Sequence, residues 1–129
     1  SFYPLMKKSE NPSIINIASM YGVYAPDFDI YKNTNINNPA AYSVSKSALI
    51  YLTKWLAKAM SPKVRVNAIS PGGVDNNQSK KFKKQYLKKT SLKKMIKPID
   101  IINLIDFLMS DKSKKITGQN FLVDGGWNG

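Results

Sequence analysis

The sequence contains no cysteine and no histidine among its 129 residues. The first absence excludes disulfide bonds and thiolate nucleophiles, and the second removes the usual general base and the commonest metal ligand. The eight acidic residues are scattered and show no metal-ligand spacing. We therefore expect no metal site, and any chemistry must come from serine, tyrosine, lysine, aspartate or a bound cofactor.

Long apolar runs and a secretory signal are also missing. No apolar stretch approaches the roughly 18 residues of a membrane-spanning helix. The opening letters SFYPLMKKSENPS lack the charged start and apolar core of a signal peptide. We expect no membrane contact and a cytoplasmic location. The 43% of hydrophobic residues is enough to bury a core, so wholesale disorder is not expected.

Acidic residues are scarce, and the net charge is +12. Such an excess favours an anionic partner. However, 19 of the 20 basic residues are lysines, whereas nucleic-acid readers usually group arginines and aromatic platforms. We expect no nucleic-acid binding. A non-enzymatic basic module that binds acidic partners stays open as an alternative, although the lysines are spread through every segment and form no single stripe.

Apolar periodicity predicts strands that alternate with helices along the chain. The runs expected to be strands are 13–19, 63–70 and 119–126. The runs expected to be helices are 40–60, 79–95 and 98–110. This alternation predicts a parallel sheet with right-handed crossovers. Because three strands are too few for an open doubly wound sheet, we expect the chain to be half of a larger α/β domain.

The patterns of the helices predict their ends and their buried faces. Asn38 is expected to cap the 40–60 helix and Pro62 to end it. The apolar or small stripe that is expected to face the sheet consists of 41, 45, 48, 52, 55, 56 and 59. In the 98–110 helix, the residues expected to point inward are Ile101, Ile102, Leu104, Ile105 and Leu108.

The residues that could take part in chemistry occur in a fixed order along the chain, at strand ends and at the start of one helix. Ser19 ends the first strand, where open α/β sheets place their ligands. Tyr42 and Lys46 lie four positions apart near the start of the next helix, so they share one face. PGGV follows the second strand and VDGG ends the third. Tyr-x-x-x-Lys alone is common by chance, but the ordered set is specific.

This ordered set resembles the C-terminal half of the short-chain dehydrogenase/reductase family over nearly the whole chain. The resemblance implies the C-terminal half of a Rossmann-like, doubly wound parallel sheet, with 1–129 as the catalytic part of one domain. It implies an NAD- or NADP-dependent oxidoreductase that exchanges a hydride with a carbonyl or alcohol of a small molecule. The segments YGVYAPDF and NPAAY are also similar to oxidoreductases of flagellin modification and nonulosonate biosynthesis. This similarity implies that the substrate is a sugar or nucleotide sugar.

The resemblance also implies a role for each matched residue. Ser19 would hold the substrate oxygen, and Tyr42 would exchange a proton with that oxygen as general acid/base. Lys46 would favour the phenolate of Tyr42 and bind the cofactor ribose, so both residues also count as cofactor-binding. The residues expected to border the nicotinamide are Pro71, Gly72 and Val74. Because Ser19, Tyr42 and Lys46 are all present, we do not expect an inactive family member.

The family's Gly-rich dinucleotide loop, T-G-x-x-x-G-x-G, and its catalytic asparagine have no counterpart in this chain. We therefore expect the chain alone to bind no dinucleotide, with activity belonging to a longer parent that forms a homodimer or homotetramer. The 40–60 helix is expected at one subunit contact. Asn16 and Asn67 are expected to be structural rather than catalytic.

Two further features concern the separation of Ser19 from Tyr42 and the lysine-rich stretch 80–97. Ser19 and Tyr42 are 23 positions apart, farther than in most members, and the extra residues are expected to bring Tyr24, Phe28 and Tyr31 close to the site. The stretch 80–97 matches the family's mobile substrate lid and holds nine lysines and no acid. It predicts attraction of a phosphate or carboxylate on the substrate, and the alternative interpretation is a solvated helix face.

Overall fold

The fold, seen in a computed structural model that describes residues 3–6 and 8–127, is an α/β arrangement around a parallel sheet. The strands, in the spatial order β1-β2-β3, are β1 (Ser13–Ile17), β2 (Arg65–Pro71) and β3 (Asn120–Val123). The α-helices are α1 (Tyr3–Met6), α2 (Ala40–Ala59), α3 (Lys80–Leu87) and α4 (Pro98–Met109). Three short 3-10 helices are η1 (Met20–Gly22), η2 (Phe28–Tyr31) and η3 (Asp111–Ser113). The predicted parallel α/β class is confirmed.

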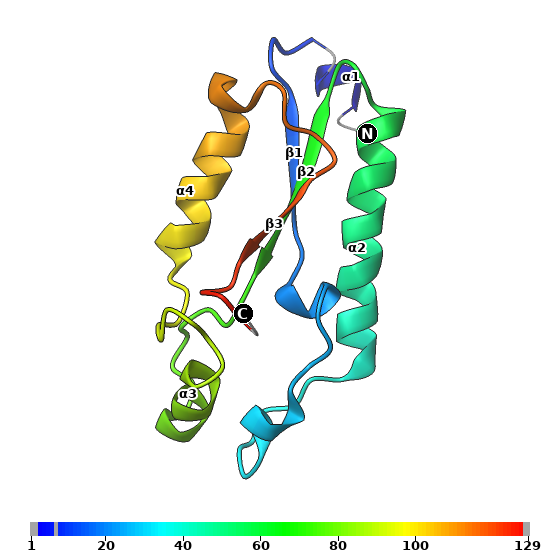
Figure 1. The fold of residues 1–129 in the computed structure, drawn as a ribbon. Helices are drawn as coiled ribbons and strands as arrows, with labels where there is room; N and C mark the ends of the chain where they lie inside the picture. Colours follow the sequence, from blue (N-terminus) through cyan, green and yellow to red (C-terminus); the bar gives the residue numbers. More distant parts are fainter. Residues whose placement is uncertain (1–2, 7, 128–129) are drawn as a thin grey trace.

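The sheet lies between α2 on one face and α4 on the other (Figure 1). The central strand β2 pairs with both neighbours, and all seven of its residues are buried. The three strands run in the same direction, so their carboxyl ends meet at one edge, at the bottom of Figure 1. There α3, η1 and η2 gather around the sheet. No described helix is long and apolar enough to cross a membrane.

The predicted inward stripe of α2 was wrong. Helix α2 turns Thr53 and Ala57 toward the sheet, and of the predicted stripe Leu56 alone packs against the buried core. Trp55 and Leu52 are 59% and 45% exposed. The physical reason is that a small, polar face fits the close helix–sheet approach, where the Asn16 side chain donates a hydrogen bond to Thr53 Oγ1 at 2.8 Å.

Three other sequence predictions about the helices need correction. Asn38 does not cap α2, because the N-cap is Pro39, which makes no side-chain capping bond. The 79–95 helix ends at Leu87, since the next turn leaves the helix and the Ser91 and Leu92 backbone N–H groups bind the carbonyls of Gly126 and Gly125. Helix α4 lies where it was predicted, but Ile102 is 46% exposed rather than inward.

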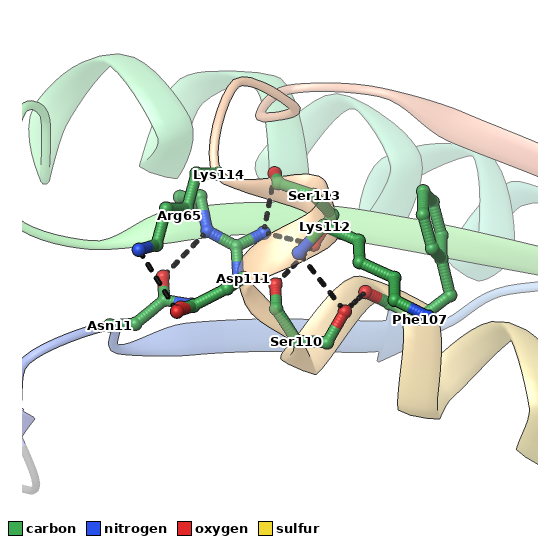
Figure 2. A network of polar contacts seen from close by, with 8 residues as sticks. All are labelled: Asn11, Arg65, Phe107, Ser110, Asp111, Lys112, Ser113 and Lys114. Atoms are coloured by element: carbon green, nitrogen blue, oxygen red, sulfur yellow. Dashed lines mark hydrogen bonds and ion pairs between the residues drawn. The ribbon is translucent and has the colours of Figure 1, made fainter.

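Arg65, the first residue of β2, joins the amino end of the sheet to the end of α4 (Figure 2). Its guanidinium donates to Leu108 O at 2.8 Å and to Ser113 Oγ at 3.1 Å. It also donates to Ser113 O, Ile116 O and the Asn11 side chain. Asn11 in turn donates to Asp111 Oδ1 at 3.0 Å. One arginine therefore satisfies carbonyls that the helix end cannot satisfy itself.

Candidate active site

Ser19 lies at the carboxyl end of β1, where the chain leaves the sheet. Its backbone is extended and it forms the N-cap of η1, accepting a hydrogen bond on Oγ from the Tyr21 backbone N–H at 3.2 Å. The residue is only 6% exposed. Because the strand ends at Ile17 instead of the predicted position 19, the serine is held by a capping turn rather than by the sheet ladder. Its own hydroxyl hydrogen stays available for a further acceptor.

Lys46 ties helix α2 to the end of β1. Its Nζ donates a hydrogen bond to Ile17 O at 3.0 Å and lies 5.7 Å from the centroid of the Tyr42 ring. Tyr42 is in the first turn of α2 and is 41% exposed. The structure thus places the ammonium over the phenol ring and next to the strand end that leads to Ser19. The three predicted catalytic residues share one edge of the sheet.

Gly22 allows η1 to approach α2 closely, and the sequence patterns had not singled it out as part of the site. A Cβ at this position would lie 2.8 Å from the Lys46 carbonyl carbon and 2.9 Å from its oxygen. Ser47 Oγ donates to Gly22 O at 2.8 Å across the same contact. Any side chain here would push the Ser19 turn away from Lys46. The sequence feature that could have indicated this close approach is a glycine three residues after the serine at the strand end.

The Pro71–Val74 turn follows β2 at the same edge of the sheet. The Gly72 N–H binds Val123 O at 2.8 Å, and Val74 forms a bridge with Ile96. The Gly73 N–H donates to the hydroxyl of Tyr86, a residue of α3, at 2.6 Å. A Cβ on Gly72 would lie 2.7 Å from that hydroxyl, so the turn needs glycine to accommodate Tyr86. The predicted Pro71, Gly72 and Val74 therefore lie beside the lysine-rich helix.

An aromatic cluster that the sequence patterns missed lies beneath both turns. Its members are Tyr21, Tyr31, Phe82, Tyr86 and Trp127. Tyr86 stacks on Trp127 with centroids 4.8 Å apart, and its hydroxyl donates to Met20 Sδ at 3.8 Å. The cluster thereby connects the turn after Ser19 with the turn at Gly73. In the sequence, the cluster was indicated only by Phe82 and Tyr86, which are four positions apart and therefore share one helix face.

The tyrosines around the site differ in burial. Burial raises the pKa of Tyr21, Tyr31 and Tyr86 above the ordinary value of a phenol. These three side chains stay neutral near pH 7 and act as hydrogen-bonding groups. Of Tyr21, Tyr31, Tyr42 and Tyr86, Tyr42 is the one with a large exposed fraction.

The remaining polar predictions can be placed as well. Asn67 is fully buried; its side chain donates to Ile116 O and accepts from the Gln119 N–H, which is a structural role. Tyr31 joins the aromatic cluster, while Phe28 is 62% exposed and lines a cavity of about 450 Å³ beside α2 with Tyr24. Among the described residues there is no group of three or more His, Cys, Asp or Glu that could hold a metal.

Comparisons with known proteins identify the family that the chain is similar to. A family model described as enoyl-(acyl carrier protein) reductase matches residues 1–128. The chain is 40% identical over 127 residues to post-translational flagellin modification protein A of Campylobacter coli, covering 98% of this chain and 50% of that protein. It is 34% identical over 128 residues to a 3-oxoacyl-[acyl-carrier-protein] reductase of Thermotoga maritima, covering 95% of this chain and 48% of that one.

Solved structures show the same likeness. A short-chain dehydrogenase of Leptospira borgpetersenii with bound NAD+ superimposes with a TM-score of 0.88 at 41% identity, over 98% of this chain and 48% of that chain. A 4-hydroxyisoleucine dehydrogenase complexed with NADH gives a TM-score of 0.75 at 38% identity, over 89% and 45%. The chain spans about half the length of the relatives it matches. It belongs to the short-chain dehydrogenase/reductase family.

Proposed function

We propose that this short-chain dehydrogenase/reductase chain is the catalytic, C-terminal part of an NAD- or NADP-dependent oxidoreductase. One observation carries the proposal: Lys46 Nζ lies 5.7 Å from the centroid of the Tyr42 ring and donates a hydrogen bond to Ile17 O, and Ser19 follows two residues later. The dinucleotide-binding half would lie outside residues 1–129, and residues 1–129 alone would hold no cofactor. Relatives with bound NAD+ or NADH support the choice of cofactor.

The donors at this edge fit a nicotinamide nucleotide. An ammonium has three N–H donors, and Ile17 O takes one of those of Lys46, which leaves two for the hydroxyls of a ribose. The segment proposed to border the nicotinamide ring is Pro71–Val74, whose glycines leave their side-chain space to Tyr86. When bound, such a cofactor supplies or accepts the hydride.

The chain's own residues handle the proton and the substrate oxygen. In the reduction direction, the Tyr42 hydroxyl donates its proton to the carbonyl oxygen while the carbonyl carbon gains a hydride, so the product is an alcohol. Lys46 stabilises the negative charge left on the phenol oxygen. Ser19, whose Oγ already accepts the Tyr21 N–H, has its own hydrogen left to donate to the same substrate oxygen. Oxidation runs through the same groups in reverse.

The substrate that we propose is a sugar or nucleotide sugar with a carbonyl or secondary alcohol. The similarity to a protein named for flagellin modification supports this choice. The competing function is a non-enzymatic basic module that binds acidic partners. It is disfavoured because the cations form no continuous stripe, and several of them already face carboxylates of the same chain: Lys32 pairs with Asp29, Lys83 with Asp75 and Lys114 with Asp111.

For the parent we propose a homodimer or homotetramer in which α2 contacts a second copy. The outward face of α2 carries Tyr51 at 71% and Trp55 at 59% exposure, next to Leu52. Together with Ala48 these side chains form a shallow apolar surface. Large exposed aromatic side chains gathered on one helix face are typical of protein interfaces.

Lys46→Ala is expected to weaken NADH binding by the full-length protein about 10- to 100-fold. The loss corresponds to the net worth of about one hydrogen bond between a charged group and the ribose hydroxyls, about 1.5–3 kcal/mol. NADH fluorescence on titration measures the affinity. Lys58→Ala is the matched control, because Lys58 is exposed near the far end of the same helix. Equal affinity in the wild type and Lys46→Ala, or no saturable NADH binding by the full-length protein, would refute the proposed function.

The lysine-rich stretch is proposed to attract an anionic substrate, and the structure selects which lysines to test. Lys83 and Lys89 already pair with Asp75 and Asp27. Lys94 and Lys97 line a cavity that also contains three aspartates, Asp75, Asp100 and Asp124. The remaining exposed lysines that carry no such compensation include Lys80, Lys84 and Lys88.

Reversing Lys80, Lys84 and Lys88 to glutamate is expected to raise KM for an anionic substrate about 10-fold at low salt, with little change in kcat. The effect should shrink at physiological salt, where the Debye length is about 8 Å. The control reverses Lys58, Lys63 and Lys112, which changes the net charge equally but away from α3. If both triple variants shift KM alike, or neither does, the lysine stretch is a solvated surface.

A further inference from the structure

The turn that follows β2 is held by backbone hydrogen bonds at two points and by a side chain between them. The Gly72 N–H binds Val123 O at 2.8 Å, and the Ile96 N–H binds Gly73 O at 3.1 Å. The Gly73 N–H lies between these two anchors and donates to the Tyr86 hydroxyl at 2.6 Å. At Gly73, the backbone donor of the turn is therefore held by a side chain of α3 and not by the sheet.

Tyr86 itself has little freedom to move. It is 1% exposed, and its ring stacks on Trp127 and on Phe82 with centroids 4.8 and 5.9 Å apart. Both glycines of the turn lie against it: a Cβ on Gly72 would be 2.7 Å from the hydroxyl, and one on Gly73 would be 2.8 Å from Cζ. Burial raises the pKa of Tyr86, so its hydroxyl stays protonated near pH 7 and can accept and donate at the same time.

The same side chain also contacts the segment that follows Ser19. Its hydroxyl donates to Sδ of Met20, the next residue after Ser19, at 3.8 Å. Trp127, on which Tyr86 stacks, meets the Tyr21 ring edge-on with centroids 6.3 Å apart. The Tyr21 N–H in turn holds Ser19 Oγ at 3.2 Å. Tyr86 thus lies between the serine proposed to bind the substrate oxygen and the turn proposed to border the nicotinamide.

We infer that Tyr86 is a positioning residue for hydride transfer: it fixes the Pro71–Val74 turn relative to Ser19. The inference rests on the proposed function, in which this turn borders the nicotinamide. Hydride transfer needs the reacting atoms about 3–3.5 Å apart and aligned, and a displacement of about 1 Å can slow such a step about 100-fold. Because Tyr86 is buried against the turn, it acts on the position of the nicotinamide and does not touch the substrate.

Tyr86→Phe in the full-length protein provides the test. The change removes the acceptor of the Gly73 N–H but keeps the ring that stacks on Trp127. Without cofactor, amide hydrogen exchange at Gly73 should quicken at least about 10-fold, because its N–H is left without a partner. Tyr31→Phe is the matched control. It removes the hydroxyl that donates to Tyr21 Oη in the same aromatic cluster, and it should change exchange at Gly73 less than about 2-fold.

NADH alone reports whether the turn holds the nicotinamide. The reduced ring is fluorescent, so the fast part of its anisotropy decay measures how freely the bound ring moves. Tyr86→Phe should increase the amplitude of this fast part at least about 2-fold, and Tyr31→Phe should leave it unchanged. NADH affinity should change less than about 3-fold in both variants, because Lys46, proposed to bind the ribose, is retained. A loss of stability alone would not separate ring motion from affinity.

The rate of the chemical step completes the test. In single turnovers with a ketone and saturating NADH, hydride transfer should slow about 10- to 100-fold in Tyr86→Phe and less than about 2-fold in Tyr31→Phe. Unchanged exchange at Gly73 in Tyr86→Phe overturns the inference, and so do ring motion and a transfer rate that match those of Tyr31→Phe. If Tyr86→Phe does not fold, the wild type decides: a protected Gly73 amide supports the inference and an unprotected one overturns it. Failure of the proposed function appears separately, as absence of saturable NADH binding by the wild type.

Discussion

Replacing Arg65 by alanine is expected to lower the free energy of unfolding by about 3–5 kcal/mol, since it removes a buried guanidinium that donates several hydrogen bonds. The residue is 8% exposed and donates to Leu108 O, Ser113 and Ile116 O. Without the guanidinium, Leu108 O, Ser113 O and Ile116 O each keep a second donor but lose a hydrogen bond from a charged group, a bond worth about 1.5–3 kcal/mol. Urea denaturation followed by circular dichroism measures the change.

Two controls define what the guanidinium contributes. Arg65→Lys keeps the charge but not the planar fork, so it should recover part of the lost stability and no more. Lys114→Ala removes the exposed ion pair with Asp111 in the same region and should cost less than about 1 kcal/mol. A loss for Arg65→Ala no larger than that for Lys114→Ala would show that the network of Figure 2 is not what holds α4 to the sheet.

The positions of the candidate catalytic residues in the fold could be predicted from the sequence, because the sequence pattern indicates where strands end. Ser19 follows an apolar run and Tyr42 begins a helix, and parallel strands bring their carboxyl ends to one edge. No such rule says which face of a helix meets the sheet. In α2 the more apolar face, with Trp55, points away from the sheet, and Thr53 packs against it. A hydrophobic stripe does not reveal whether a sheet or another surface covers it.

Contacts between distant segments escaped prediction for a related reason. Periodicity extended the lysine-rich helix to 95, but backbone bonds from Ser91 and Leu92 to the Gly125–Gly126 turn end it earlier. Tyr86 lies in the stretch 80–97, for which one interpretation was a solvated helix face, yet it is 1% exposed and bonded to the Gly73 N–H. The sequence patterns did not single out Arg65. In each case the deciding partner lies more than ten residues away in sequence, where local patterns carry no information.

Tyr42→Phe is expected to reduce kcat of the full-length protein by about 100- to 10,000-fold, the range of general acid–base catalysis. The change removes one hydroxyl and retains the ring that lies 5.7 Å from Lys46 Nζ. NADH affinity should therefore stay within about 2-fold, because the cofactor contacts proposed for Lys46 remain. Tyr51→Phe is the matched control, since it removes a hydroxyl from the same helix at a position that is 71% exposed on the outward face.

The most direct measurement is a single-turnover assay of the full-length wild type and its Tyr42→Phe variant with bound reduced cofactor. The substrates to mix are keto forms of nucleotide sugars and simple ketones, and the absorbance of the reduced nicotinamide reports hydride transfer. The account predicts decay of that absorbance in the wild type and in Tyr51→Phe, and a rate at least about 100-fold lower in Tyr42→Phe at saturating cofactor. Equal rates in Tyr42→Phe and wild type would contradict it.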